Sequence, residues 1–173
     1  MYIKKCQSKD ISITTKFYDN IVKFLDEHTN YPRWIYKVYP SENSVKEMVE
    51  KESQYICISD DKIIGAFVLN DEPQGCYWKA NWGRDIDEGS YMVLQTLAID
   101  PSIQRRGLAS EIIQFCIEKA NLEGYEAIRI DVIPDNYPTK KLFEKNGFEY
   151  VGDVDLELDI GNNPYFSLYE LNL

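Results

Sequence analysis

The chain has 173 residues, a formal net charge of −10, 44% hydrophobic residues and 13% aromatic residues. This length and hydrophobic content suit one folded domain, since single cores of about 100 to 200 residues are common. The acidic charge argues against nucleic acid and anionic membranes as partners, because phosphate-rich surfaces bind basic patches.

Two further features bear on the compartment. No apolar run approaches the roughly 18 to 20 residues of a membrane span, and residues 1–10 lack the apolar core of a signal peptide, so we expect a cytoplasmic protein. The cysteines are far apart in the sequence and form no CxxC pair, which argues against a zinc site or a disulfide framework: Cys6, Cys57, Cys76 and Cys116.

The first fifty residues predict a short strand and two helices. Residues 2–6 favour the strand. The next apolar residues recur at helical spacing and define one face: Ile13, Phe17, Ile21, Phe24 and Leu25. We expect this helix to end near His28. Residues 31–40, which are aromatic and contain two prolines, indicate an ordered loop, and Ser41 suits the N-cap of a second helix that runs to about Glu52.

The middle of the chain predicts three strands and a long loop. Residues 55–59 and 62–70 favour a hairpin around the turn residues Asp60 and Asp61. Residues 70–90 are polar and aromatic, and a loop of this length in a compact domain is usually functional or disordered. The nearly continuous apolar run at 91–99 is typical of a strand buried on both faces at the centre of a sheet.

The last third alternates helices and strands. A helix with one apolar stripe ends at Gly124, a strand covers 126–133, and a helix over 137–145 ends at the C-cap pair Asn146 and Gly147. Residues 148–160 alternate apolar and acidic side chains, as in a strand with one wet face, and a turn at 161–164 leads to a strand at 165–171. The order of elements indicates a mixed α/β fold with one central sheet and helices on both faces.

The segment from Gln104 to Ala109 reads QRRGLA and joins the central strand to a helix. Glycine allows a ligand to approach the backbone, and the first turn of a helix presents free N–H groups at the positive end of its dipole. Arg105 and Arg106 add charge-assisted hydrogen bonds. Together these features favour a site for a pyrophosphate. The alternative is an ordinary helix start with two solvated arginines.

This segment resembles the Q/R-x-x-G-x-G/A signature of the GNAT acyl-CoA N-acyltransferase superfamily. The preceding LAIDP, residues 97–101, resembles the strand end of that family, and NYPTKKLFEKNGF, residues 136–148, resembles its N-x-x-A-x-x-L-Y-E-K-x-G-F segment. The likeness is strongest over residues 91–151 and follows the order of elements elsewhere.

The resemblance implies a single GNAT-type N-acetyltransferase domain over residues 1–173, built on a twisted, mostly antiparallel sheet of about seven strands with helices on both faces. It implies acetyl-CoA as co-substrate, no metal, and an amine acceptor that attacks the thioester directly; a homodimer is left open. The residues implied in coenzyme binding are Leu97, Ala98, Ile99, Gln104, Arg105, Arg106, Gly107, Leu108, Ala109, Ser110, Asn136 and Phe143.

An ammonium acceptor must lose a proton before it attacks, so the reaction needs a carboxylate, a histidine or an ordered water. Glu88 is the preferred base, with Gln95 as a residue that orients a water, and Thr96, Asp131 and the single histidine, His28, as the other candidates. The alternative is that each of these candidates has only a structural role.

The sequence departs from the family pattern at two positions. Thr139 replaces a common alanine, and Phe143 stands where a tyrosine often protonates the leaving thiolate. The neighbouring Tyr137 is our candidate for this acid, and water or unassisted departure of the thiolate is the alternative.

The two long loops are rich in aromatic rings, which attract ammonium groups when acids lie beside them. We select Trp34, Tyr77 and Trp82 as acceptor-binding residues; the alternative is that these rings cover the sheet. The function expected is N-acetyl transfer to a small cationic amine or a peptide amine. A non-catalytic acyl-CoA-binding or sensor module of the same fold is the second hypothesis, because the tyrosine is missing and no base is obvious.

Overall fold

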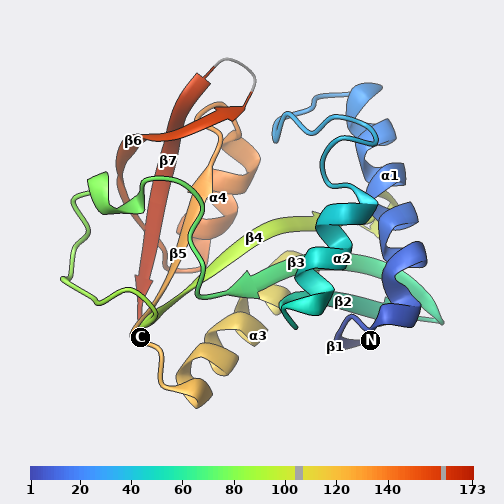
Figure 1. The fold of residues 1–173 in the computed structure, drawn as a ribbon, viewed down its shortest axis with the longest axis horizontal. Coiled ribbons are helices and arrows are strands. Elements are labelled where there is room, and N and C mark those ends of the chain that lie inside the picture. The colour runs from blue at the N-terminus through green and yellow to red at the C-terminus, as the bar shows by residue number, and fades with distance from the viewer. Residues whose placement is uncertain (104–106, 161–162) are drawn as a thin grey trace. The chain divides into compact units, whose positions relative to one another are not determined.

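A computed structural model describes residues 1–103, 107–160 and 163–173 (Figure 1). It contains four α-helices: α1 (Ile11–Asp26), α2 (Glu42–Glu50), α3 (Leu108–Glu123) and α4 (Tyr137–Lys145). The strands are β1 (Tyr2–Lys5), β2 (Gln54–Ser59), β3 (Lys62–Asn70), β4 (Tyr91–Ile99), β5 (Ala127–Val132), β6 (Glu149–Ile160) and β7 (Asn163–Asn172). None of the helices within the described ranges is both long and apolar enough to cross a membrane.

The strands form one seven-stranded sheet in the order β1-β2-β3-β4-β5-β7-β6. The pairs β1–β2, β2–β3, β5–β7 and β6–β7 are antiparallel. The pair β4–β5 is parallel, with Tyr91–Val93 opposite Ala127–Arg129. The predicted mixed α/β fold with a mostly antiparallel sheet of seven strands is therefore confirmed.

The chain divides into two compact units. The first unit comprises residues 1–30, 34–69 and 95–108, and the second comprises residues 31–33, 70–94 and 109–173. Strand β4 therefore contributes its first residues, through Leu94, to the second unit, and its remainder, from Gln95, to the first.

The core of the first unit lies between α1, α2 and the strands. Phe17, Tyr18 and Ile21 of α1 pack with Val45 and Val49 of α2 and with residues of the sheet: Ile56, Ala66 and Ala98. Ser41 caps α2 as predicted, because its hydroxyl accepts a hydrogen bond from the Ser44 amide at 3.2 Å.

The prediction for Ile13 was wrong. Its side chain is 53% exposed, although it was assigned to the apolar face of the first helix. The fully buried Tyr18 marks the centre of that face. At 3.6 residues per turn, Ile13 lies about 140° around the helix from Tyr18, which places it on the solvent side.

In the second unit, the two faces of β5 carry different side chains. Ala127, Arg129 and Asp131 alternate with Ile128 and Ile130, because successive strand residues point to opposite faces. The loop at 71–90, which includes a short 3₁₀ helix at Tyr77–Lys79, packs on the first of these faces, where Ala127 joins a core cluster with loop and sheet residues: Tyr77, Ile86, Tyr91, Val93, Leu156, Phe166 and Leu168.

Strand β7 begins earlier than predicted. Asn163 and Pro164 belong to β7, and Asn163 pairs with Ile160 of β6. The predicted turn residues at 161 and 162 lie outside the described residues. The strand therefore includes two of the four residues, GNNP, that the sequence assigned to the turn.

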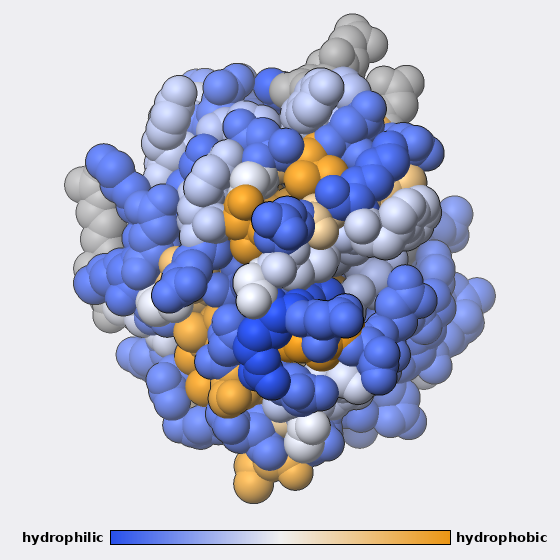
Figure 2. Space-filling model, turned by 90° about the vertical axis from the view of Figure 1, so that its left-hand side faces the viewer, coloured by the Kyte–Doolittle hydropathy of each residue, from blue (hydrophilic) through white to orange (hydrophobic). Residues whose placement is uncertain are grey.

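Hydrophilic side chains cover most of the face shown in Figure 2, with small hydrophobic spots between them. This pattern agrees with the 28% charged residues and the net charge of −10.

Candidate functional site

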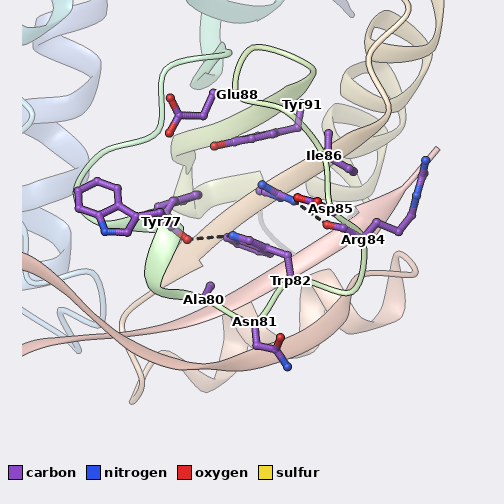
Figure 3. A pocket seen from close by; sticks show the side chains of 11 residues that line it. Tyr77, Ala80, Asn81, Trp82, Arg84, Asp85, Ile86, Glu88 and Tyr91 are labelled. Atoms are coloured by element: carbon purple, nitrogen blue, oxygen red, sulfur yellow. Dashed lines mark hydrogen bonds between the residues drawn. The ribbon is translucent and has the colours of Figure 1, made fainter.

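A pocket of about 390 Å³ lies in the second unit, between the loop at 71–90, Tyr91 of β4 and Arg129 of β5. Figure 3 shows the ring of Tyr91 above that of Trp82, while the Arg84 side chain points away from both. The lining residues are Tyr77, Trp78, Ala80, Asn81, Trp82, Arg84, Asp85, Ile86, Glu88, Tyr91 and Arg129.

Arg129 fills the space between these two rings. Its guanidinium carbon lies 4.1 Å from the centroid of the Trp82 ring and 4.0 Å from that of Tyr91. Its Nε donates a hydrogen bond to Oε1 of Glu170 at 2.9 Å, and both side chains are 3% exposed. The ring faces that meet Arg129 are thus occupied by a cation of the chain itself, so a substrate ammonium must use other surfaces of the pocket.

Tyr77 links the pocket to Asp131. Its hydroxyl donates a hydrogen bond to Oδ2 of Asp131 at 2.6 Å, and its carbonyl oxygen accepts one from Nε1 of Trp82 at 2.9 Å. Burial raises the pKa of Tyr77 well above its usual value, and the Asp131 carboxylate acts in the same direction. Burial likewise raises the pKa of Asp131, while the hydrogen bond from Tyr77 lowers it.

Two acids lie at the exposed rim of the pocket. Asp85 and Glu88 both have exposed side chains, and neither forms an ion pair within the part of the chain that the structure describes. Arg84, by contrast, donates to Glu126 at 2.8 Å. The rim therefore carries two carboxylates available to a cationic ligand.

The second half of β4 has an unusual backbone. Thr96 has φ 52, and a β-branched residue in the left-handed region is a genuine outlier. Two tyrosines hold it: the Tyr18 hydroxyl donates to the Thr96 carbonyl at 3.0 Å, and the Tyr39 hydroxyl lies 2.7 Å from Thr96 Oγ1. Gln95 is half-buried directly before this residue.

Of the three predicted coenzyme residues that follow Thr96, Ala98 is buried, and Leu97 and Ile99 are half-buried. Trp34 also belongs to the first unit, where its ring packs edge-on against Tyr18 and Tyr39 at centroid distances of 6.0 and 6.4 Å. The structure thus brings Tyr77, Trp82 and Glu88 together in one pocket, and Trp34 is not among its lining residues.

The predicted phosphate turn is described in part. Gln104, Arg105 and Arg106 lie outside the described residues. Gly107 has φ 89, and a Cβ at this position would meet no atom within 4 Å, so the backbone is open to a ligand. Leu108 and Ala109 begin α3, and the Ser110 hydroxyl accepts a hydrogen bond from Nδ2 of Asn146 at 3.1 Å.

The second predicted coenzyme segment forms the start of α4. Asn136 is the N-cap, and its Oδ1 accepts a hydrogen bond from the Thr139 amide at 3.3 Å. Tyr137 is 60% exposed. Phe143 is buried and packs edge-on against Phe148 at a centroid distance of 5.1 Å.

Sequence reasoning missed Arg129, Tyr91, Asp85 and Glu170 as members of the site or its support. The sequence contains one signal for Arg129, because it is the only charged residue in the otherwise apolar segment Ala127–Ile130. A charge inside a buried strand requires a partner, but the sequence does not name Glu170. Within residues 1–103, 107–160 and 163–173, no group of three or more His, Cys, Asp or Glu side chains is placed to hold a metal ion.

Comparison with known proteins decides the family. The model of the acetyltransferase (GNAT) family matches residues 21–148, well over half of the chain. The chain belongs to the GNAT acetyltransferase family. The predicted membership of this family, made from the signature segments, is confirmed.

Individual relatives agree with this assignment. Mycothiol acetyltransferase of Brachybacterium faecium is 28% identical over 108 residues, which are 62% of this chain and 29% of the relative. The chain spans less than a third of the length of the curated relatives it matches.

Solved structures share the fold over nearly the whole chain. A GNAT acetyltransferase from Streptococcus agalactiae has a TM-score of 0.78 at 18% identity, with 99% of this chain and 95% of that chain covered. The acetyltransferase yncA of Salmonella typhimurium, whose structure includes acetyl-CoA, has a TM-score of 0.70 at 15% identity, with 99% and 93% covered.

Proposed function

We propose that residues 1–173 act as one N-acetyltransferase domain that transfers an acetyl group from acetyl-CoA to a primary amine of a small cationic molecule or peptide. The acceptor attacks the thioester directly while both substrates are bound. The observation that carries this proposal beyond the family is the pocket of about 390 Å³ whose rim presents Asp85 and Glu88. Exposed carboxylates at the rim of a pocket attract a cation.

The residues at the start of α3 fit the pyrophosphate of acetyl-CoA. A helix N-terminus with a glycine in the left-handed region offers free N–H groups and close backbone approach, and Gly107 has the conformation and the open space that this requires. Arg105 and Arg106 would add charge, and Leu97, Ala98 and Ile99 would lie along the pantetheine. The bound coenzyme supplies an activated thioester.

Acceptor binding is assigned to the pocket. Glu88 and Asp85 would attract the ammonium group. Trp78, which is 71% exposed, and the edges of Tyr77 and Trp82 would contact its carbon atoms. Trp34 remains a predicted acceptor contact without a place in this pocket.

For catalysis, Glu88 is proposed to take the first proton from the ammonium, Gln95 to orient a water, and Tyr137 to protonate the leaving thiolate. The exposure of Glu88 and Tyr137 supports exchange of protons with solvent. Most of the rate would come from holding the two substrates in reacting geometry, which is worth up to roughly 7 to 11 kcal/mol in the best cases.

The test is thiol release from acetyl-CoA with a panel of monoamines, diamines and peptide amines. We expect turnover with at least one cationic amine and a thermal shift with acetyl-CoA alone, because a ligand that binds the native state stabilises it. The double variant Arg106→Glu/Gly107→Val should lose both. A full thermal shift in this variant would contradict the assigned phosphate site.

The second candidate is a non-catalytic acyl-CoA-binding module. It is favoured by one observation: Phe143, which replaces the expected tyrosine, is buried against Phe148 and has no hydroxyl to donate. Tight acetyl-CoA binding without turnover on any amine would select this alternative. A slower thiol release in Tyr137→Phe would instead support the enzyme with Tyr137 as the acid.

A further inference from the structure

We propose that Tyr77 and Asp131 form a relay that accepts the proton lost by the attacking nitrogen during acetyl transfer. This inference rests on the proposed function, because it assigns a step of that reaction to two residues of the pocket wall. It differs from the role given to Glu88, which takes the proton of the free ammonium before attack.

The relay runs from the pocket wall to Asp131 on β5. Tyr77 lines the pocket, and its hydroxyl donates to Oδ2 of Asp131 at 2.6 Å. Asp131 and Arg129 lie two residues apart on β5, so their side chains point to the same face of the sheet. Arg129 also lines the pocket. Asp131 is therefore connected through its hydrogen bond to Tyr77, a residue of the pocket wall.

A structural role alone does not explain why residue 131 carries a carboxyl group. Asp131 forms no ion pair within the described parts of the chain, and its carboxylate accepts hydrogen bonds from the neutral Tyr77 hydroxyl and from its own backbone amide. A poorly solvated carboxylate without a cation costs free energy, and such groups gather at functional sites. The matched pair in the same unit, Tyr125 and Asp71, is exposed and longer, at 3.3 Å.

The surrounding charges suit a proton acceptor. Tyr77 contacts Asp131 from the loop. Tyr91 of β4 also raises the pKa of Tyr77, and Arg129 of β5 lowers it. Glu170 of β7 neutralises Arg129, and Glu88 lies near Tyr91. Because burial raises the pKa of Asp131, this group is a stronger base than an exposed aspartate, and efficient general bases have a pKa close to the working pH.

The proposed step balances protons and bonds. Attack of the neutral amine forms the N–C bond and leaves a positive charge on nitrogen. The nitrogen then gives one proton to Tyr77 Oη while the Tyr77 proton passes to Asp131 Oδ2. The C–S bond breaks, the electron pair leaves with sulfur, and the thiolate takes a proton from Tyr137 or water. Asp131 finally returns its proton to solvent.

The experiment measures thiol release from pH 5 to 10 with an amine that the wild type uses, for Asp131→Asn, Tyr77→Phe and the control Tyr125→Phe. We expect both relay variants to lose about 10² in kcat with a smaller change in KM, the size typical of general acid–base catalysis. Asp131→Asn should also lose the acidic limb of the profile. The control should match the wild type.

Activity at high pH distinguishes the role of the relay from that of Glu88. Glu88→Gln should recover near the pKa of the amine, whereas Asp131→Asn should not, because the nitrogen must still lose a proton after attack. Asparagine keeps an oxygen that accepts from Tyr77, so Asp131→Asn decides the matter even if Tyr77→Phe fails to fold. Relay variants with the kcat and profile of an active wild type would overturn the relay alone. A wild type inactive on every amine would overturn the proposed function and the relay with it.

Discussion

Arg129 and Glu170 form an ion pair that is almost completely removed from solvent, with both side chains 3% exposed. The guanidinium also lies between the rings of Trp82 and Tyr91. Charges in this position are stable only while each partner is present, because a lone buried charge carries a large desolvation penalty. Glu170 therefore supports the pocket although it does not line it.

Glu170→Gln should lower the free energy of unfolding by about 3 to 5 kcal/mol, because it leaves Arg129 buried without a counter-charge. Chemical denaturation measures this change. The control is Glu126→Gln, which breaks the exposed pair with Arg84 and should cost at most about 1 kcal/mol. Equal losses in the two variants would contradict the account of Arg129.

Asp131 makes stability depend on pH. Its pKa in the folded protein is raised, so above the unfolded pKa of about 3.9 the folded state holds the proton more tightly than the unfolded state does. The free energy of unfolding then falls as the pH rises through the folded pKa. In a series of thermal melts at increasing pH, the Tm of Asp131→Asn relative to the wild type should become more favourable as the pH rises above about 4, the unfolded pKa. A constant difference across this range would show that the pKa of Asp131 is not raised.

At the scale of elements, the loop at 71–90 is attached to β6 at Gly75. A Cβ on Gly75 would lie 2.4 Å from the carbonyl oxygen of Leu156, and the neighbouring Cys76 amide donates to that same oxygen at 3.0 Å. The absence of a side chain at Gly75 therefore allows the loop that carries Tyr77 and Trp82 to approach the strand closely.

Gly75→Ala should destabilise the protein more than Gly89→Ala does. Both glycines have positive φ, 71 and 83, so the backbone strain of alanine is similar, but a Cβ on Gly89 meets no atom within 4 Å. We expect about 1 kcal/mol for Gly89→Ala and at least 1 to 3 kcal/mol more for Gly75→Ala, measured by denaturant unfolding. Indistinguishable midpoints would argue against the close approach.

Helix α4 begins at Asn136, which is both its N-cap and a predicted coenzyme contact. Asn136→Ala should cost about 1 kcal/mol as a lost cap and should also reduce the thermal shift with acetyl-CoA. Ser41→Ala removes the N-cap of α2 and should cost a similar amount while it keeps the full shift. If both variants retain the shift, Asn136 serves the helix alone.

At the scale of the whole molecule, the net charge of −10 gives the surface a negative field. Such a field raises the local concentration of cations, and salt screens it over a Debye length of about 10 Å at 0.1 M. The charge therefore favours a cationic acceptor over the anionic coenzyme, for which Arg105 and Arg106 are the proposed local positive charges.

The value of kcat/KM for a diamine should fall several-fold between about 20 and 500 mM salt, and the fall should be smaller for a monoamine, because each positive charge loses its attraction. Steady-state thiol release in a salt series measures both. A salt effect of equal size on the two amines would show that the acceptor gains little from the field of the protein.

The sequence by itself determined the order of the elements, the fold class and the family. Strand β4 and helix α4 have the predicted bounds, because hydrophobic period, caps and turn residues act within a few positions of one another. The signature at Gln104–Ala109 is local in the same sense, since the glycine and the helix start on which the proposed anion site depends are adjacent in the sequence.

Only the tertiary structure decided how distant side chains meet. Tyr77 bonds Asp131 across 54 positions, and Arg129 bonds Glu170 across 41, through the strand register and the packing of the loop. The period of a strand indicates which residues share a face, but it does not indicate which loop covers that face or which ring stacks on which charge. For this reason the sequence identified Glu88, Tyr77 and Trp82 as separate candidates, and the fold placed them around a buried arginine.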